Sequence, residues 1–388
     1  MKILLIHTYY RLRGGEDAVF EEECKLLEEN GFIVRRLVFE NRTGVTGFIQ
    51  FLKSIWNWQA VRRLRREVKY FMPDIIHIHN WHFASGPVIA FEAKRLGIPV
   101  VATLHNYRLI CPSGTLFHKG KIFTQSIHTN FPWKAVLHGV YRGSRLQTFW
   151  LALIVWAHGR RGTWNKIDRF IVLTKAVKDI FSSSKLKVPF DHFVIKPNFI
   201  PRSRVYLRNG ARNSRFLFVG RLSIEKGIET LLKAFQDTSY ELDIVGDGPL
   251  KELVVSQVKN SSNIRYLGNV DRNTVLQLMS QCSALVMPSI WYEPFGLVIV
   301  EAFSQKTPVI ASNLGSMSVL IRHGYNGLHF NAGELQSLRH QIQYWSELSE
   351  VQKEAFYKNA ISSYEERYSP EDNLKQLAKI YDSIFQVD

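Results

Sequence analysis

The chain has 388 residues, of which 46% are hydrophobic and 13% aromatic, and it carries a formal net charge of +16. These proportions exclude a disordered chain and predict a folded protein of two domains. The longest markedly apolar stretch, residues 149–157, is too short to span a bilayer, and the N-terminal segment has too few apolar residues for a signal peptide. The three cysteines, Cys24, Cys111 and Cys282, lie far apart without metal-ligand spacing, which suits a reducing compartment. We therefore expect a cytoplasmic protein.

The excess of positive over negative charge is confined to the first half of the chain. Residues 1–200 hold 30 Lys and Arg against 14 Asp and Glu, whereas residues 201–388 hold 20 of each. Such a field attracts an anionic partner. Tryptophan and phenylalanine accompany the basic residues at 51–66 and at 133–164, a pattern typical of helices at a membrane interface. We expect an anionic membrane surface rather than nucleic acid as the partner; the alternative is that these Trp side chains belong to the core.

Predicted strands and helices alternate along the chain. The strands are expected at 2–6, 32–37, 74–78, 99–103, 169–173, 216–219, 242–245, 264–267, 284–287 and 308–311. A helix over 16–30, closed by Gly31, follows the first strand. This alternation predicts parallel sheets with helices on both faces. We expect an α/β protein with two Rossmann-like domains facing each other across a cleft. The domains are predicted at 1–205 and 206–369, joined by a linker within 196–215, and 370–388 is predicted as a final amphipathic helix.

Ligands of such sheets bind at the carboxyl ends of the strands. In the first half, Gly14 and Gly15 follow the first strand and can present amides to a phosphate or to a reacting sugar. His105 ends the strand 99–103, where it can bond a sugar hydroxyl or move a proton. A nearby run of histidines with period-two spacing allows a metal cluster, although the favoured interpretation is a strand end that lines an acceptor site. That run contains His77, His79 and His82.

In the second half, Arg221 and Lys226 follow the strand 216–219. An Arg and a Lys above a sheet edge suit a diphosphate and can neutralise a leaving group without a metal. Gly246 ends the strand 242–245, where a glycine allows either a close approach to a ligand or a plain turn.

Glu293 and Glu301 flank the point where the strand 284–287 gives way to a helix. Phe295, Gly296 and Leu297 lie at this helix start, whose amides favour negative charge. Two carboxylates beside an anion site suit the hydroxyls of a sugar and a ribose, because carboxylates accept paired O–H bonds well.

The run Pro-Ser-Ile-Trp-Tyr-Glu-Pro-Phe-Gly-Leu at 288–297, followed by Glu301-Ala302, resembles the signature of the family 4 retaining glycosyltransferases, which have the GT-B fold. The run 220–227 resembles the Gly-Arg…Glu-Lys-Gly motif of the same family. The resemblance implies that the two basic residues of this motif hold the donor phosphates. It also implies that Glu293 orients the donor sugar and Glu301 the ribose, and that the last helix returns to the first domain. Residues Gly14, Gly15, Gly246, Phe295, Gly296 and Leu297 are then donor contacts, and His105 lies next to the donor sugar. Gly315-Ser316 departs from the pattern, because many relatives carry a second glycine there.

The expected activity is retaining transfer of a sugar from a UDP- or GDP-linked donor to an acceptor hydroxyl. A lipid-linked glycan in cell-surface polysaccharide assembly is the expected acceptor, and the protein is expected to be peripheral on the inner face of the membrane. We expect neither cofactor nor metal, since the sequence lacks an Asp-x-Asp motif. The alternatives are a glycosidase, a sugar-nucleotide epimerase on a related fold, and a non-catalytic basic protein of the membrane surface.

Overall fold

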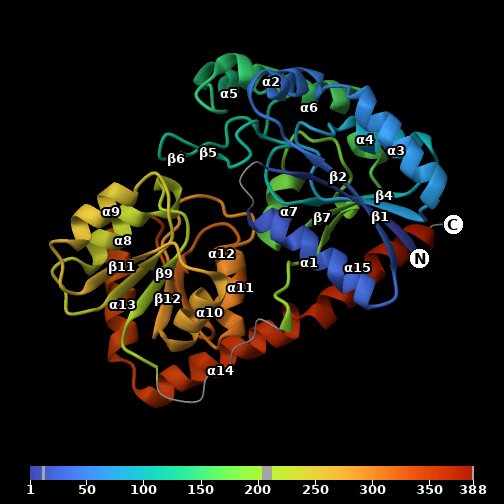
Figure 1. The fold of residues 1–388 in the computed structure, drawn as a ribbon. Coiled ribbons are helices and arrows are strands. Elements are labelled where there is room, and N and C mark those ends of the chain that lie inside the picture. The colour runs from blue at the N-terminus through green and yellow to red at the C-terminus, as the bar shows by residue number, and fades with distance from the viewer. Residues whose placement is uncertain (11–13, 203–211, 387–388) are drawn as a thin grey trace. The chain divides into compact units, whose positions relative to one another are not determined.

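The computed structural model describes residues 1–10, 14–202 and 212–386 (Figure 1). They divide into two compact units. The first unit contains residues 1–116 and 123–197 together with the chain from Asn373 onward, and the second contains 117–122 and 198–372. The predicted boundary between 205 and 206 lies outside the described residues. The last helix, α15 (Pro370–Phe385), packs in the first unit for most of its length.

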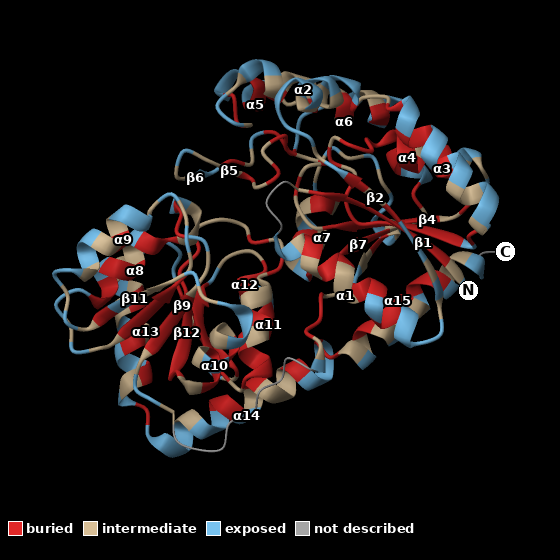
Figure 2. Cartoon of the chain, in the orientation of Figure 1, coloured by how far each residue is buried: buried red, intermediate tan, exposed pale blue. Residues whose placement is uncertain are grey.

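The first unit is built on a six-stranded parallel sheet of order β2-β1-β3-β4-β7-β8. The five strands that we predicted are confirmed to within three residues, and one strand, β8, was missed. The strands are β1 (Lys2–Tyr9), β2 (Ile33–Glu40), β3 (Ile75–Ile78), β4 (Val100–Leu104), β7 (Arg169–Val172) and β8 (Phe193–Ile195). The central strands β3 and β4 are buried along their whole length, as expected where helices cover both faces of a parallel sheet (Figure 2).

Some helices of the first unit begin where short polar side chains accept from free backbone amides. Asn57 caps α3 by accepting from the amides of Gln59 and Ala60, and Thr174 caps α7. The helices are α1 (Gly15–Glu29), α2 (Gly44–Lys53), α3 (Trp58–Phe71), α4 (Val88–Arg95), α5 (Trp133–His138), α6 (Arg145–Arg160) and α7 (Lys175–Ser182). Helices α1 and α15 share one hydrophobic cluster with the sheet, in which Phe20 and Leu377 meet Ile3. Short 3-10 turns lie at η1 (Trp164–Lys166) and η2 (Phe190–His192).

The second unit has another six-stranded parallel sheet, of order β11-β10-β9-β12-β13-β14. Its strands are β9 (Phe216–Val219), β10 (Leu242–Val245), β11 (Ile264–Gly268), β12 (Ala284–Met287), β13 (Val309–Ser312) and β14 (Gly327–Phe330). Prediction missed β14 and placed the other five. The core is centred on Phe216, Phe235 and Trp345. A two-stranded hairpin, β5 (Phe117–His118) and β6 (Lys121–Ile122), belongs to this unit by its contacts.

The helices of the second unit include two long ones near its C-terminal end. They are α8 (Ile228–Phe235), α9 (Lys251–Val258), α10 (Arg272–Gln281), α11 (Leu297–Ser304), α12 (Met317–Leu320), α13 (Leu335–Glu347) and α14 (Glu350–Arg367), with a 3-10 turn η4 (Ile224–Lys226). Within the described part of the chain, no helix combines the length and the apolar character needed to cross a bilayer.

The strand order places a switch point in each sheet. In the second unit the chain runs from β9 to β10 and β11 on one side and from β12 to β13 and β14 on the other, so β9 and β12 are neighbours at the centre. In the first unit the corresponding neighbours are β1 and β3. Loops after such strand pairs form a crevice at the carboxyl edge of the sheet, which is where open α/β sheets bind ligands. The predicted site residues follow these strands and their neighbours.

Candidate functional site

Two of the residues predicted for the donor site form an ion pair. Lys226, at the end of η4, pairs with Glu293 in the loop that follows β12. Glu293 is buried and also accepts a hydrogen bond of 2.9 Å from the Ser289 hydroxyl, while the Lys226 ammonium lies 5.5 Å from the centre of the Trp291 ring. We had assigned the two residues to different parts of the donor. The structure joins them into one charged group above the β9–β12 switch point.

A glycine explains how the two loops come so close. Gly227 has φ of 70°, and a Cβ placed there would lie 1.9 Å from the carbonyl oxygen of Pro288. The Ile290 amide donates to the Glu225 carbonyl across the same contact at 2.9 Å. Only glycine allows this approach. The Glu-Lys-Gly run therefore presents Lys226 to the loop of Glu293 through the backbone.

Arg221 lies at the start of the same loop. Its side chain is exposed and makes no hydrogen bond or ion pair within the described part of the chain. This exposed guanidinium, in the loop that also carries Lys226, leaves five N–H donors for a ligand.

Glu301 is engaged by a residue that we did not predict. It lies one turn into α11 and pairs with Arg272, the first residue of α10. A hydroxyl ligand of Glu301 would share this carboxylate with Arg272 or displace it. A lone arginine after Asp271 carries no motif in the sequence, so no signal marked it.

The positions of the remaining predicted donor contacts of the second unit are explained by contacts within the protein. Gly246 has φ of 138°, and a Cβ there would meet the Gly220 carbonyl oxygen at 1.9 Å, so glycine is required by the neighbouring loop whether or not a ligand binds. The Phe295 ring is buried near Tyr368, which leaves its backbone for a donor. Gly296, with φ of 96°, turns the chain so that α11 begins at Leu297.

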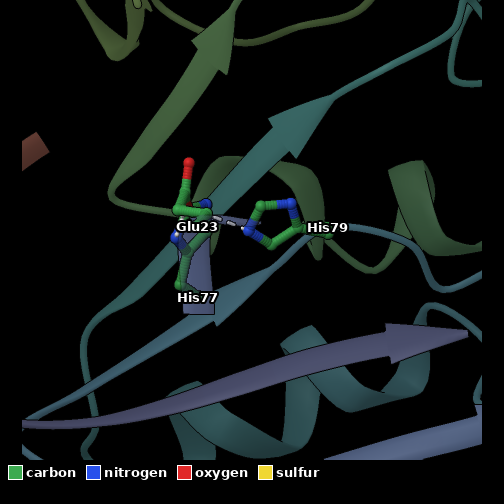
Figure 3. Close-up of side chains that lie close together, drawn as sticks. All are labelled: Glu23, His77 and His79. Carbon is green, nitrogen blue, oxygen red and sulfur yellow. Dashed lines mark hydrogen bonds and ion pairs between the residues drawn. The ribbon is translucent and has the colours of Figure 1, made fainter. Parts of the chain in front are cut away.

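In the first unit, a buried charged cluster lies under the carboxyl end of the sheet (Figure 3). Glu23 of α1 accepts from the Lys196 ammonium at 2.7 Å, and both side chains are about 1% exposed. The second carboxylate oxygen lies 3.1 Å from His79 Nε2 and 3.3 Å from His77 Nδ1. Burial by itself raises the pKa of Glu23, but Lys196 and the two imidazoles outweigh it and hold that pKa well below its ordinary value. Glu23 is thus an ionised carboxylate, and the Lys196 side chain donates to it.

The cluster contains two of the three histidines of the predicted run, together with Glu23 of α1. Ligand atoms of Glu23, His77 and His79 lie within 4.8 Å of one another, which is close enough to hold a metal ion. These atoms are already bonded, however, because Lys196 supplies the cation and His77 Nε2 contacts the Thr103 hydroxyl at 2.8 Å. The donor set therefore fits an ion pair better than a metal. His82 lies outside this group: it is buried against Phe83, and its ring nitrogens have no hydrogen-bond partner in the described residues.

Hydrogen bonds extend the cluster to His105. His79 Nδ1 lies 3.1 Å from His105 Nε2, and the two rings are stacked. The Glu23 carboxylate only accepts, so in the neutral form of His79 the hydrogen is on Nε2, Nδ1 accepts, and His105 Nε2 carries a hydrogen. Burial first, and then the nearby His79 and His7, lower the pKa of His105 well below the usual value. His105 is thus neutral at pH 7, and its Nδ1 is an acceptor.

Gly14 and Gly15 lie at the start of α1 and are exposed. The Gly14 amide donates to Asp17 Oδ2 at 2.9 Å, so one of the two amides predicted to face a ligand is used within α1. Gly14 has an extended backbone with open space around its Cα, and nothing in this unit requires a glycine there.

Two α/β units, each with a parallel sheet and charged loops at its switch point, are the arrangement expected of a GT-B glycosyltransferase. Residues 28–204 match the model of Glycosyltransferase Family 4, and residues 203–363 match that of Glycosyl transferases group 1. Together these two matches cover most of the chain, and it belongs to the family 4 glycosyltransferases of the GT-B fold.

Relatives and solved structures agree with this assignment. An uncharacterised glycosyltransferase of Methanocaldococcus jannaschii is 26% identical over 352 residues, which is 88% of this chain and 87% of the relative. A 42.6 kDa protein in the cps region of Klebsiella pneumoniae is 22% identical over 77% of this chain and 76% of its own. Anabaena HepE in complex with UDP has the same fold, with a TM-score of 0.69 at 20% identity over 99% of this chain and 100% of that one. Sucrose-phosphate synthase of Thermosynechococcus elongatus gives a TM-score of 0.71 at 18% identity, with both chains covered completely.

Proposed function

We propose that the protein is a retaining, metal-independent glycosyltransferase that uses a UDP- or GDP-linked sugar. The observation that carries the proposal is the ion pair between Lys226 and the buried Glu293 at the switch point, with exposed Arg221 in the same loop as Lys226. The HepE structures contain UDP and, in another crystal, UDP-glucose, which supports a nucleotide-sugar as the donor of this chain.

In this proposal the two ends of the charged group have different tasks. Lys226 and Arg221 hold the diphosphate and stabilise the charge that develops on it as the sugar C1–O bond breaks. Glu293 accepts from donor-sugar hydroxyls and keeps Lys226 in place. The acceptor oxygen bonds to C1 on the face that the diphosphate leaves, and the proton of the acceptor hydroxyl passes to a departing phosphate oxygen. His105 accepts a hydrogen bond from a sugar hydroxyl through Nδ1.

We further propose that the acceptor is lipid-linked and that the first unit binds an anionic membrane. An interfacial surface on α2, α5 and α6 supports this proposal, and Trp150 of α6 joins α2 by donating to the Phe51 carbonyl at 2.9 Å. Its exposed apolar residues are Val45, Phe48, Ile49, Leu52, Trp133, Leu137 and Leu146. Lys53, Lys134 and Arg145 lie on the same helices. Trp164, by contrast, is buried, so part of the aromatic pattern belongs to the core. Relatives from cps regions support a role in polysaccharide assembly.

The test of the donor site is Glu293→Ala, measured by nucleotide-sugar hydrolysis and by binding of UDP. We expect the rate of hydrolysis to fall by about tenfold to a hundredfold, because a buried charge-assisted hydrogen bond is lost and Lys226 loses its partner. Glu229→Ala, on the exposed face of α8, is the matched control. Full activity in folded Glu293→Ala protein would refute the assignment.

The membrane proposal has its own measurement. Wild-type protein should co-sediment with anionic liposomes and be released by salt, because the attraction is electrostatic as well as apolar. Phe48→Ser/Leu52→Ser should sediment less. Equal sedimentation with neutral and anionic liposomes would contradict it.

A further inference from the structure

The first unit contains a pocket that none of the predicted donor residues lines. It has a volume of about 410 Å³ and lies between the segment after β4, one face of α6 and the segment after α7. The segment after β4 supplies residues 108–112, and 185–187 close the opposite wall. A cavity of this size accommodates a small ligand or one part of a larger one.

The lining of the pocket is basic. Arg108, Arg160, Lys185 and Lys187 all contribute, and no Asp or Glu is among the lining residues. The sequence has no carboxylate between Glu92 and Asp168, although Arg108 interacts electrostatically with Glu16, which does not line the pocket. Such a site attracts an anion.

Two polar groups of the lining lack partners. Ser126 is 3% exposed, and its hydroxyl makes no hydrogen bond within the described residues. Nε and Nη1 of Arg108 are also buried and without a hydrogen-bond partner in the described part of the chain. A buried donor that is left unsatisfied costs about 1–3 kcal/mol, and more when it is charged. These atoms are themselves buried, so an oxyanion in the pocket would reach them through a movement of the two side chains.

Another part of the pocket wall is apolar, and some of it belongs to a helix that also carries the interfacial surface. Ile127, Val155 and Trp156 form part of the wall. Trp156 is 37% exposed, with the Arg160 guanidinium 5.2 Å from its ring centre. Trp156 lies on α6, which also carries Leu146 of that surface, and the lining residue Pro132 directly precedes α5. An apolar chain that leaves the pocket on this side would meet the exposed apolar residues.

We infer that this pocket binds the phosphate and the first part of the hydrocarbon chain of a lipid-linked acceptor. The inference rests on the proposed function for the role of acceptor, while the binding of a phosphate-bearing amphiphile rests on the pocket alone. The oxyanion lies against Arg108, Ser126 and the two lysines, and the chain lies along Trp156. Bilayer phospholipid offers the same chemistry, so the experiment separates the two sources.

The experiment measures binding of geranyl diphosphate to the full chain by calorimetry, with inorganic diphosphate and geraniol as the two half-ligands. We expect saturable binding of geranyl diphosphate that is at least about tenfold tighter than binding of either half, because both walls contribute. Lys185→Ala/Lys187→Ala should weaken it at least about tenfold. Lys25→Ala/Lys175→Ala, which removes two exposed lysines of the same unit, should leave the affinity unchanged.

Several outcomes would overturn the inference. Equal affinity for inorganic diphosphate and geranyl diphosphate would mean that the pocket is a free-phosphate site. A Lys185→Ala/Lys187→Ala protein that binds geranyl diphosphate normally but loses anionic vesicles would assign the lysines to bilayer lipid. UDP binding is measured on the same samples. Protein that binds UDP but no geranyl diphosphate refutes only this inference, whereas binding of geranyl diphosphate without UDP contradicts the proposed function.

Discussion

Replacement of Lys196 by methionine should destabilise the first unit strongly. Lys196 follows β8 and is about 1% exposed, and its ammonium donates to Glu23 at 2.7 Å and to Asn373 Oδ1 at 3.0 Å. Methionine has a similar length but no charge, so the Glu23 carboxylate would remain buried with only two imidazoles as partners. The chain positions tied by this lysine are far apart in sequence: α1, the end of β8 and the start of α15.

The magnitude follows from the burial of both partners. Removing one member of a buried ion pair costs about 3–5 kcal/mol, because the remaining charge is uncompensated. For a unit of about 200 residues, each kcal/mol lowers the melting temperature by roughly 2–4 °C, so Lys196→Met should lower it by roughly 10 °C.

The assay is thermal unfolding followed by circular dichroism, with two comparison variants. Lys175→Met breaks the exposed pair with Asp179, whose members are 70% and 54% exposed, and should leave the melting temperature unchanged. Glu23→Gln/Lys196→Met removes both buried charges and should recover much of the loss. A shift for Lys196→Met no larger than that of Lys175→Met, or a double variant no more stable than the single one, would refute the reasoning.

Three further outcomes are expected. Gly227→Ala should destabilise the second unit more than Gly268→Ala, since both have φ near 70° but only at Gly227 does a Cβ meet a carbonyl oxygen; equal melting temperatures would contradict this. Burial raises the pKa of Glu16 to about 8, so the folded state holds a proton that the unfolded state releases above about pH 4.5. Stability should therefore fall as the pH rises from 4.5 to 8, and Glu16→Gln should flatten this fall in melting curves. For Glu23, whose pKa is depressed, stability is present above about pH 4.5 and should be lost as the pH falls through its folded pKa, an acid transition that is absent in Glu23→Gln/Lys196→Met.

The sheets could be predicted from sequence because their strands are short, continuous apolar runs. β9, β10 and β12 were placed to the residue, since each is four residues long and followed by a glycine, proline or charged loop. The two missed strands of the six-stranded sheets are the edge strands β8 and β14. β8 has three residues, with Ile195 exposed, and β14 begins with a glycine, so neither shows a strong apolar pattern.

The donor loops could also be found, because their residues are consecutive and carry a family signature. The ion pair between two of these loops could not be predicted. Lys226 and Glu293 are 67 positions apart, and their contact depends on the switch point that makes β9 and β12 neighbours and on the close approach at Gly227. Arg272 reaches Glu301 from a different helix, and nothing in the sequence near Arg272 indicates a ligand or an ion pair.

The Glu23 cluster shows a second limit of sequence reasoning. Glu23 is one of three consecutive glutamates in α1, and Lys196 falls in a segment that reads as a linker, so composition assigns both to the surface. The helical spacing instead places Glu23 on the buried face of α1, together with Phe20 and Leu27. A carboxylate on that face requires a cation, and the chain supplies Lys196 where β8 ends beside the start of α15. The same carboxylate sets the hydrogen on His79 and, through it, the acceptor nitrogen of His105. A residue that stabilises the first unit therefore also determines what its candidate site residue can bind.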